Sequence, residues 1–175
     1  MVEIRRPIPV NEAIQRVMDK VISLESEIVP LEKTYGRILA EPVIATHDVP
    51  PFHRSPYDGY AIRSTDSKGA SDKNRISFNV IDEIGAGYVS NFALNEREAI
   101  RIMTGAPLPE NADAVVMFEQ TKSDHQSFTI RKPFTPYENV SLKGEDAKQG
   151  EELIPSGSFI QPGVVALLAT FGYAN

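Results

Sequence analysis

The sequence has 175 residues, of which 41% are hydrophobic and 24% charged, a composition typical of a globular chain with one domain or two small ones. The formal net charge is −6 and the basic residues are scattered, which argues against binding to duplex nucleic acid. No apolar run is long enough to span a bilayer, and the N-terminus lacks an apolar signal-peptide core. No cysteine is present, so disulfides and thiolate metal sites are excluded. We therefore expect a cytoplasmic protein with no nucleic-acid partner and no membrane partner.

An amphipathic helix is predicted near the N-terminus, after an extended lead-in over 1–9 in which Pro7 and Pro9 interrupt helical structure. Asn11 is the predicted N-cap, and the helix continues for about three turns. Its apolar residues recur at helical spacing, which predicts a face that packs against a neighbour. These residues are Ala13, Ile14, Val17, Met18, Val21 and Ile22.

Two short strands are predicted next, at 28–31 and 42–45, with a turn over 33–40 between them. Pro30 cannot donate a hydrogen bond to a ladder, so the first strand is expected at a sheet edge. The second strand leads directly into a proline-rich loop.

That loop, residues 50–61, is the least ordinary run of the chain and reads Pro-Pro-Phe-His-Arg-Ser-Pro-Tyr-Asp-Gly-Tyr-Ala. Pro50 and Pro51 fix φ and remove two backbone donors, which predicts a rigid extended loop. Asp58 and Gly59 are a turn signal, because glycine tolerates positive φ. A rigid loop that holds an acid beside a glycine can present a functional carboxylate, and a proline-stiffened surface loop is the alternative.

Many short β-strands are predicted between residues 60 and 135, separated by loops rich in polar residues and glycine. Their spacing indicates a small barrel-like or sandwich-like subdomain. The candidate strands are 60–63, 76–84, 98–102, 114–117 and 127–130.

Two further stretches, one before and one after the predicted strand 127–130, contain candidate functional residues. In residues 101–110 a strand ends at Thr104 and Gly105, where a hydroxyl and free backbone amides can face an oxyanion; a capped turn is the alternative. In 143–150 the adjacent acids Glu145 and Asp146 stand between glycines, as in loops that bind hard cations; a solvated acidic turn is the alternative. A short helix is predicted over 164–169, with Gly172 as its stop.

These stretches resemble, in order, the molybdopterin molybdenumtransferases of the MoeA/gephyrin type. The loop has Phe-x-x-Ser-x-x-Asp-Gly-Tyr-Ala where the family usually reads Phe-Asp-x-Ser-Ala-Met-Asp-Gly-Tyr-Ala, and His53 replaces the family acid. Similar family segments match Gly-Arg-Ile-Leu-Ala at 36–40, Thr-Gly-Ala-Pro-Leu-Pro at 104–109 and Gly-Glu-Asp at 144–146. Family members commonly carry Ile-Arg shortly before Gly-Glu-Asp; this chain has Val140, Ser141 and Leu142 there, so no arginine role is carried over.

The resemblance implies the N-terminal region of an enzyme that inserts molybdenum from molybdate into adenylylated molybdopterin and releases AMP, with Mg²⁺. The implied fold is α+β and mainly β. A helix-and-strand subdomain formed by residues 1–45 and 141–175 would carry an inserted β-rich, barrel- or sandwich-like subdomain, 46–140. The implied partners are a second copy of the chain in a homodimer, the pterin-binding domain of the other subunit, and other proteins of cofactor synthesis.

The resemblance also implies the site residues. Asp58, Thr104 and Asp146 would be catalytic, with Asp58 and Asp146 as metal ligands and Thr104 as an oxyanion donor. Ser55, Gly59 and Gly105 would contact the bound cofactor precursor. Two other functions stay open: a non-catalytic dimerisation or interaction module of the same family, and an unrelated small-ligand domain. The 175-residue chain alone is expected to be inactive.

Overall fold

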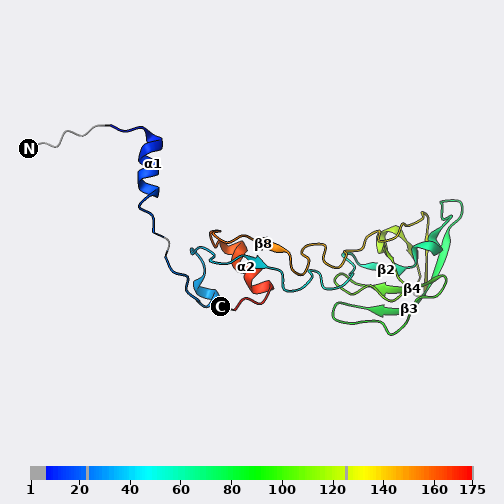
Figure 1. The fold of residues 1–175 in the computed structure, drawn as a ribbon. Helices are drawn as coiled ribbons and strands as arrows, with labels where there is room; N and C mark the ends of the chain where they lie inside the picture. Colours follow the sequence, from blue (N-terminus) through cyan, green and yellow to red (C-terminus); the bar gives the residue numbers. More distant parts are fainter. Residues whose placement is uncertain (1–6, 23, 125, 175) are drawn as a thin grey trace, which may run out of the picture.

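The computed structural model describes residues 7–22, 24–124 and 126–174, and the first part of the predicted lead-in, 1–6, lies outside them. A sheet that includes β2, β4 and β3 dominates the fold (Figure 1). It has six strands, in the order β5-β2-β4-β3-β7-β6. Strands β3 and β4 run parallel, whereas the other neighbouring pairs are antiparallel. The strands are β2 (Gly59–Ile62), β3 (Ile76–Ile84), β4 (Glu98–Ile102), β5 (Ala114–Met117), β6 (Lys122–Ser123) and β7 (Ser127–Ile130).

The sheet is buried on both faces at β2, which explains why this strand has no charged residue at any position. On one face the ring of Phe128 stacks on Tyr60, with centroids 3.9 Å apart, and on Phe78, with centroids 5.3 Å apart. The other face carries a second core that includes Ile100 and Ile102. The sheet curves into a half-barrel between these two cores, so the predicted fold, mainly β with a barrel-like part, is confirmed.

A smaller unit combines a two-stranded sheet, β1 (Val43–Ile44) with β8 (Glu152–Ile154), and helix α2 (Pro162–Thr170). Val43, Val164 and Leu168 form its core. The hydroxyl of Tyr173 accepts a hydrogen bond from the Ile44 amide and donates one to the Ile44 carbonyl, both at 3.0 Å. Gly172 has φ +80° just beyond α2, in agreement with the predicted helix stop. The subdomain boundaries expected above remain a prediction.

Helix α1 (Val10–Met18) extends away from both sheets (Figure 1). It begins after Pro9 rather than at the predicted cap Asn11, and it ends before Val21 and Ile22. None of its residues is buried, so the expected packing face has no neighbour within the described chain. Of the described helices, none combines the length and the apolarity required to cross a membrane.

Two local predictions are wrong. The stretch 28–31 forms no strand; Pro30 instead precedes the short 3-10 helix η1 (Leu31–Lys33), and Ile28 is 87% exposed. Gly59 is not a turn residue but the first residue of β2. It is glycine for a steric reason, because a Cβ at this position would lie 2.2 Å from the Val116 carbonyl oxygen.

Candidate functional site

The three unusual stretches of the sequence meet along the proline-rich loop. On one side of the loop, the Gly105 amide donates to the Ser55 carbonyl at 2.8 Å, and the Ser55 amide donates to the Ala106 carbonyl at 3.0 Å. On the other side, Arg54 and Ser141 exchange two amide-to-carbonyl hydrogen bonds, both 3.0 Å long. The loop is therefore a central extended segment between the stretch after β4 and the stretch that leads to Gly-Glu-Asp.

The Gly-Glu-Asp turn is fastened to the start of the same loop. The amides of Asp146 and Ala147 donate to the Val49 carbonyl at 2.9 and 3.1 Å, and the Gly144 amide donates to the Pro50 carbonyl at 2.9 Å. His53, which replaces the family acid, accepts a hydrogen bond from the Lys143 amide through Nδ1 at 3.0 Å. These contacts join segments that lie far apart in the sequence.

Asp58 and Thr104, two of the predicted catalytic residues, contact each other. Oδ1 of Asp58 accepts a hydrogen bond from the Thr104 amide at 2.7 Å and another from the Thr104 hydroxyl at 2.8 Å. The hydrogen bond from the Thr104 amide is the main cause that holds the pKa of Asp58 below its ordinary value, and the hydrogen bond from the Thr104 hydroxyl comes next. The positive charge of Arg101 lowers this pKa further, whereas partial desolvation of the carboxylate raises it. Asp58 is thus a fixed, ionised carboxylate at the surface, just before β2.

The other predicted site residues occupy different positions around this pair. Ser55 is fully buried, and its hydroxyl donates to the Tyr57 carbonyl at 2.5 Å. Gly105 adopts φ +86° beside Thr104. Asp146 is exposed, and its carboxylate makes no hydrogen bond or ion pair within the described part of the chain. Contact of any of these residues with a ligand stays a prediction, as does a ligand contact of Gly59.

Asp48 is a residue of this region that the sequence did not reveal. Its carboxylate accepts a hydrogen bond from the Gln149 amide at 2.9 Å and pairs with the Lys143 ammonium at 3.4 Å. The Gln149 bond is the main cause that lowers the pKa of Asp48. Asp48 therefore ties both ends of the acidic turn that carries Asp146. An acid two residues before the paired prolines is too weak a signal to indicate this role.

The two proposed metal ligands do not form a metal centre by themselves. Among the described residues, no three or more Asp, Glu or His side chains lie together in a way that could hold an ion. Mg²⁺ is often bound by one or two carboxylates together with substrate phosphates. The described residues can therefore offer single carboxylates to a shared site, but they do not form a complete ligand set.

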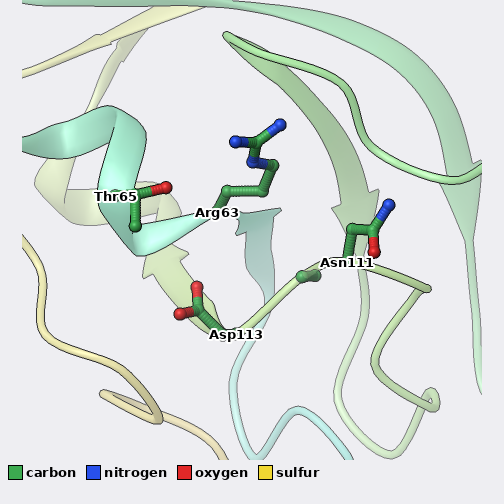
Figure 2. A pocket seen from close by; sticks show the side chains of 5 residues that line it. Arg63, Thr65, Asn111 and Asp113 are labelled. Atoms are coloured by element: carbon green, nitrogen blue, oxygen red, sulfur yellow. The ribbon is translucent and has the colours of Figure 1, made fainter.

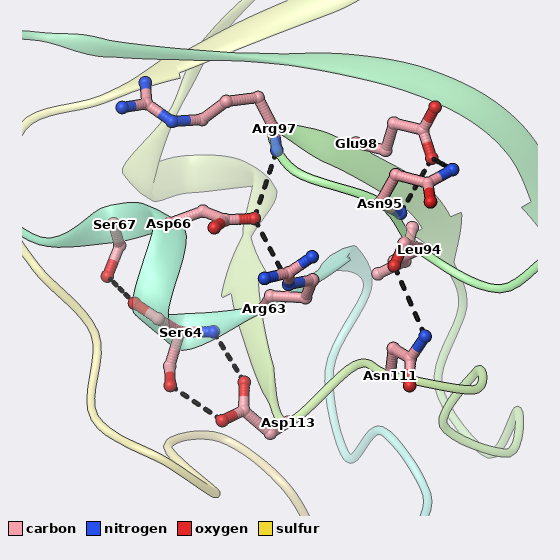
Figure 3. Close-up of polar contacts among 10 residues, drawn as sticks. All are labelled: Arg63, Ser64, Asp66, Ser67, Leu94, Asn95, Arg97, Glu98, Asn111 and Asp113. Carbon is pink, nitrogen blue, oxygen red and sulfur yellow. Dashed lines mark hydrogen bonds and ion pairs between the residues drawn. The ribbon is translucent and has the colours of Figure 1, made fainter.

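A separate polar pocket lies at the opposite end of β2 (Figure 2). It has a volume of about 500 Å³ and is lined by Arg63, Thr65, Asn111, Ala112 and Asp113. Asp113 accepts hydrogen bonds from the amide and hydroxyl of Ser64, at 2.5 and 2.7 Å (Figure 3).

The neighbouring Asp66 accepts a hydrogen bond from the Arg97 amide at 3.0 Å and pairs with Arg63 at 3.5 Å (Figure 3). These bonds hold the 3-10 helix η2 (Ser64–Ser67) against the sheet. Asp113 in this pocket and the adjacent Asp66 therefore have a structural role, and the junction around Asp58 is the stronger candidate for function.

Comparison with known proteins identifies the family of the chain. Residues 8–172 match the family described as the MoeA N-terminal region (domain I and II). Molybdopterin molybdenumtransferase from Staphylococcus aureus is 57% identical over 175 residues, and the corresponding enzyme from Staphylococcus epidermidis is 54% identical over 174 residues. These alignments cover 100% and 99% of this chain but only 42% of each relative.

Solved structures give the same answer for the fold. A molybdopterin biosynthesis moeA protein from Pyrococcus horikoshii superposes with a TM-score of 0.91 at 36% identity, over 97% of this chain and 45% of that one. A second structure of a P. horikoshii moeA protein gives a TM-score of 0.79 at 39% identity, over 95% and 43% of the two chains.

A half-barrel joined to a small helix-and-strand unit is thus shared with moeA proteins of molybdopterin biosynthesis. The chain belongs to the MoeA family and corresponds to its N-terminal region. It spans about 42% of the length of the curated relatives it matches. Membership of this family excludes the interpretation as an unrelated small-ligand domain.

Proposed function

We propose that this chain forms part of an enzyme that inserts molybdenum from molybdate into adenylylated molybdopterin and releases AMP. The observation that carries the proposal is the contact between Asp58 and Thr104, because the fold brings two family motifs together at their polar residues. The names of the curated relatives support the type of reaction.

Asp58 would act in its ionised form in this reaction. Two hydrogen bonds from Thr104 stabilise its negative charge, so Asp58 has no proton to donate at neutral pH and is a weak base, but it can accept hydrogen bonds and attract a cation. It could orient a water molecule or hold a cation next to the substrate. For Thr104 to donate to a substrate oxyanion, as the resemblance implies, its hydroxyl would have to leave Asp58.

Magnesium enters the proposal as a shared ion. Asp58 and Asp146 would each offer one carboxylate oxygen, and substrate phosphates would supply further ligands. Since the described residues hold no complete ligand set, we assign no step of the reaction to the metal.

The partner surfaces are part of the same proposal. Val10, Ile14, Val17 and Met18 of α1 are each at least 57% exposed, and an uncovered apolar helix face indicates an interface. We propose that a second copy of the chain covers this face in a homodimer. The Asp58 junction would then face the pterin-binding domain of the other subunit. Interactions with other cofactor-synthesis proteins and a cytoplasmic location complete the proposal.

The exposed face of α1 also suits the second candidate function, a non-catalytic dimerisation or interaction module. Cofactor release separates the two functions. A full-length protein that carries this chain, supplied with adenylylated molybdopterin, molybdate and Mg²⁺, is expected to release AMP and molybdenum cofactor. The 175-residue chain alone is expected to show no turnover above buffer. A full-length protein that binds partners but releases no AMP would support the interaction module instead.

Light scattering over a concentration series tests the homodimer. The wild-type chain is expected to associate as its concentration rises, and Ile14→Asp is expected to shift it toward the monomer, because this change places a charge in the apolar face. Glu12→Asp serves as the matched control on the same helix. A wild-type chain that stays monomeric at high micromolar concentration would place the dimer contacts outside this chain.

A further inference from the structure

Arg54, at the centre of the junction, carries a positive charge that has no partner among the residues the structure describes. Two neighbouring cations are neutralised: Arg101 pairs with Glu83 at 3.3 Å, and Lys143 pairs with Asp48 at 3.4 Å. The guanidinium of Arg54 makes no hydrogen bond, ion pair or ring contact within the described part of the chain. Its backbone, by contrast, is fixed on both sides by bridges to Pro107 and Ser141.

Arg54 as a whole residue is half-buried, and its guanidinium has no counter-charge within the described part of the chain. The neighbouring motifs contribute two exposed carboxylates, Asp58 and Asp146, which would repel an anionic ligand. The guanidinium of Arg54, without a counter-charge among the described residues, supplies the positive charge that such a ligand needs.

We propose that Arg54 binds a tetrahedral oxyanion at this junction, either a phosphate group or molybdate. Its planar guanidinium can donate two parallel hydrogen bonds to such an anion, which an ammonium group cannot match in geometry. The inference rests on the proposed function and deepens it, because it assigns the anionic part of the substrate to a named residue.

Ser141, the backbone partner of Arg54, provides a way to test this assignment. Arg54 and Ser141 form a hydrogen-bonded antiparallel pair, and the side chains of such a pair lie on the same side with Cα atoms about 5.5 Å apart. An arginine at position 141 could therefore reach the same ligand as Arg54.

Titration of the ¹⁵N-labelled 175-residue chain tests the proposal, with amide NMR signals as the readout. Sodium molybdate, inorganic phosphate and AMP are added separately at constant ionic strength, so that the three arms distinguish the sources of the oxyanion. At least one of them is expected to shift the amide signals of Arg54, Gly105 and Ser141. Arg54→Gln is expected to weaken this binding about tenfold or more, because the charge-assisted bonds are lost.

The double variant Arg54→Gln/Ser141→Arg is expected to restore binding, which a merely structural role of Arg54 would not do. Arg131→Gln, the same change at an exposed arginine outside the junction, should leave binding unchanged. The proposal is overturned if none of the three anions shifts these signals in the wild type, if Arg54→Gln binds as well as the wild type, or if the double variant stays as weak as Arg54→Gln. Because the titration requires no turnover, its outcome is independent of the cofactor-release assay.

Discussion

Replacement of Gly59 by alanine is expected to destabilise the half-barrel. Gly59 pairs with Ile102 on one side and with Met117 on the other, so it lies between two strands. An added Cβ would meet the Val116 carbonyl oxygen at 2.2 Å and its carbonyl carbon at 2.9 Å. All of these atoms belong to the backbone, so no flexible side chain can move away to make room.

The magnitude follows from this geometry. To reach ordinary contact, β2 and β5 would have to separate by about 1 Å, which would weaken their hydrogen bonds; overpacking of this kind costs roughly 3 kcal/mol. For a chain of this length, that loss lowers the melting temperature by about 6–12 °C. Asp58 directly precedes Gly59, so its bond to Thr104 should be disturbed as well.

Thermal unfolding followed by circular dichroism checks this prediction, with Gly85→Ala as the matched control. Gly85 has no atom within 4 Å of an added Cβ and no positive φ, so its alanine variant should melt close to the wild type or slightly above it. If Gly59→Ala melts within about 2 °C of Gly85→Ala, the steric account of Gly59 is refuted.

Three further predictions follow from the packing and from the charge of the site. Phe128→Ala removes a ring stacked between Tyr60 and Phe78 and should lower the free energy of unfolding by about 3–5 kcal/mol, as measured by denaturant titration. Its control is Phe159→Ala, at a residue that is 55% exposed, which should change this free energy by about 0.5 kcal/mol or less. Tyr173→Phe removes the hydroxyl that bonds the Ile44 amide and carbonyl, and it should lower the free energy of unfolding by about 1–2 kcal/mol. Tyr35→Phe, at an exposed residue, serves as its control. The pKa of Asp58 is lowered on folding, so its contribution to stability should be complete above about pH 5 and lost as the pH falls through the folded pKa, below about 3.9; an NMR titration that places this pKa at or above the ordinary value would contradict the assignment.

The strands of the half-barrel could be predicted because their local pattern and their environment agree. β3, β4, β5 and β7 have the bounds expected from the sequence, since each is an apolar or alternating run between polar loops. Their order in the sheet and the parallel pairing of β3 with β4 depend on contacts between distant segments, which local patterns do not encode.

The errors also have physical causes. The apolar residues at 28–31 suggested a strand, but Ile28 finds no partner strand and stays exposed. The predicted turn at Gly59 relied on backbone freedom, whereas the position requires the absence of a side chain. The sequence did indicate that the stretches around Asp58 and Thr104 were unusual, but their direct contact comes from the pairing of β2 with β4.

The roles of Asp48 and Arg54 lay beyond local patterns for the same reason. Asp48 binds the amide of a residue 101 positions away, and Arg54 pairs with Ser141 at a similar separation. A lone acid or arginine in a loop carries no signal of such a partner.

The central claim is that the carboxylate of Asp58 acts in the reaction, and one paired measurement tests it most directly. In a full-length protein that carries this chain, Asp58→Asn keeps an oxygen that can accept the hydrogen bonds of Thr104 but removes the negative charge. The variant is expected to melt close to the wild type and to release molybdenum cofactor at least about a hundredfold more slowly. Near-normal turnover with an intact fold would contradict the claim, and so would a loss of turnover explained by a large loss of stability.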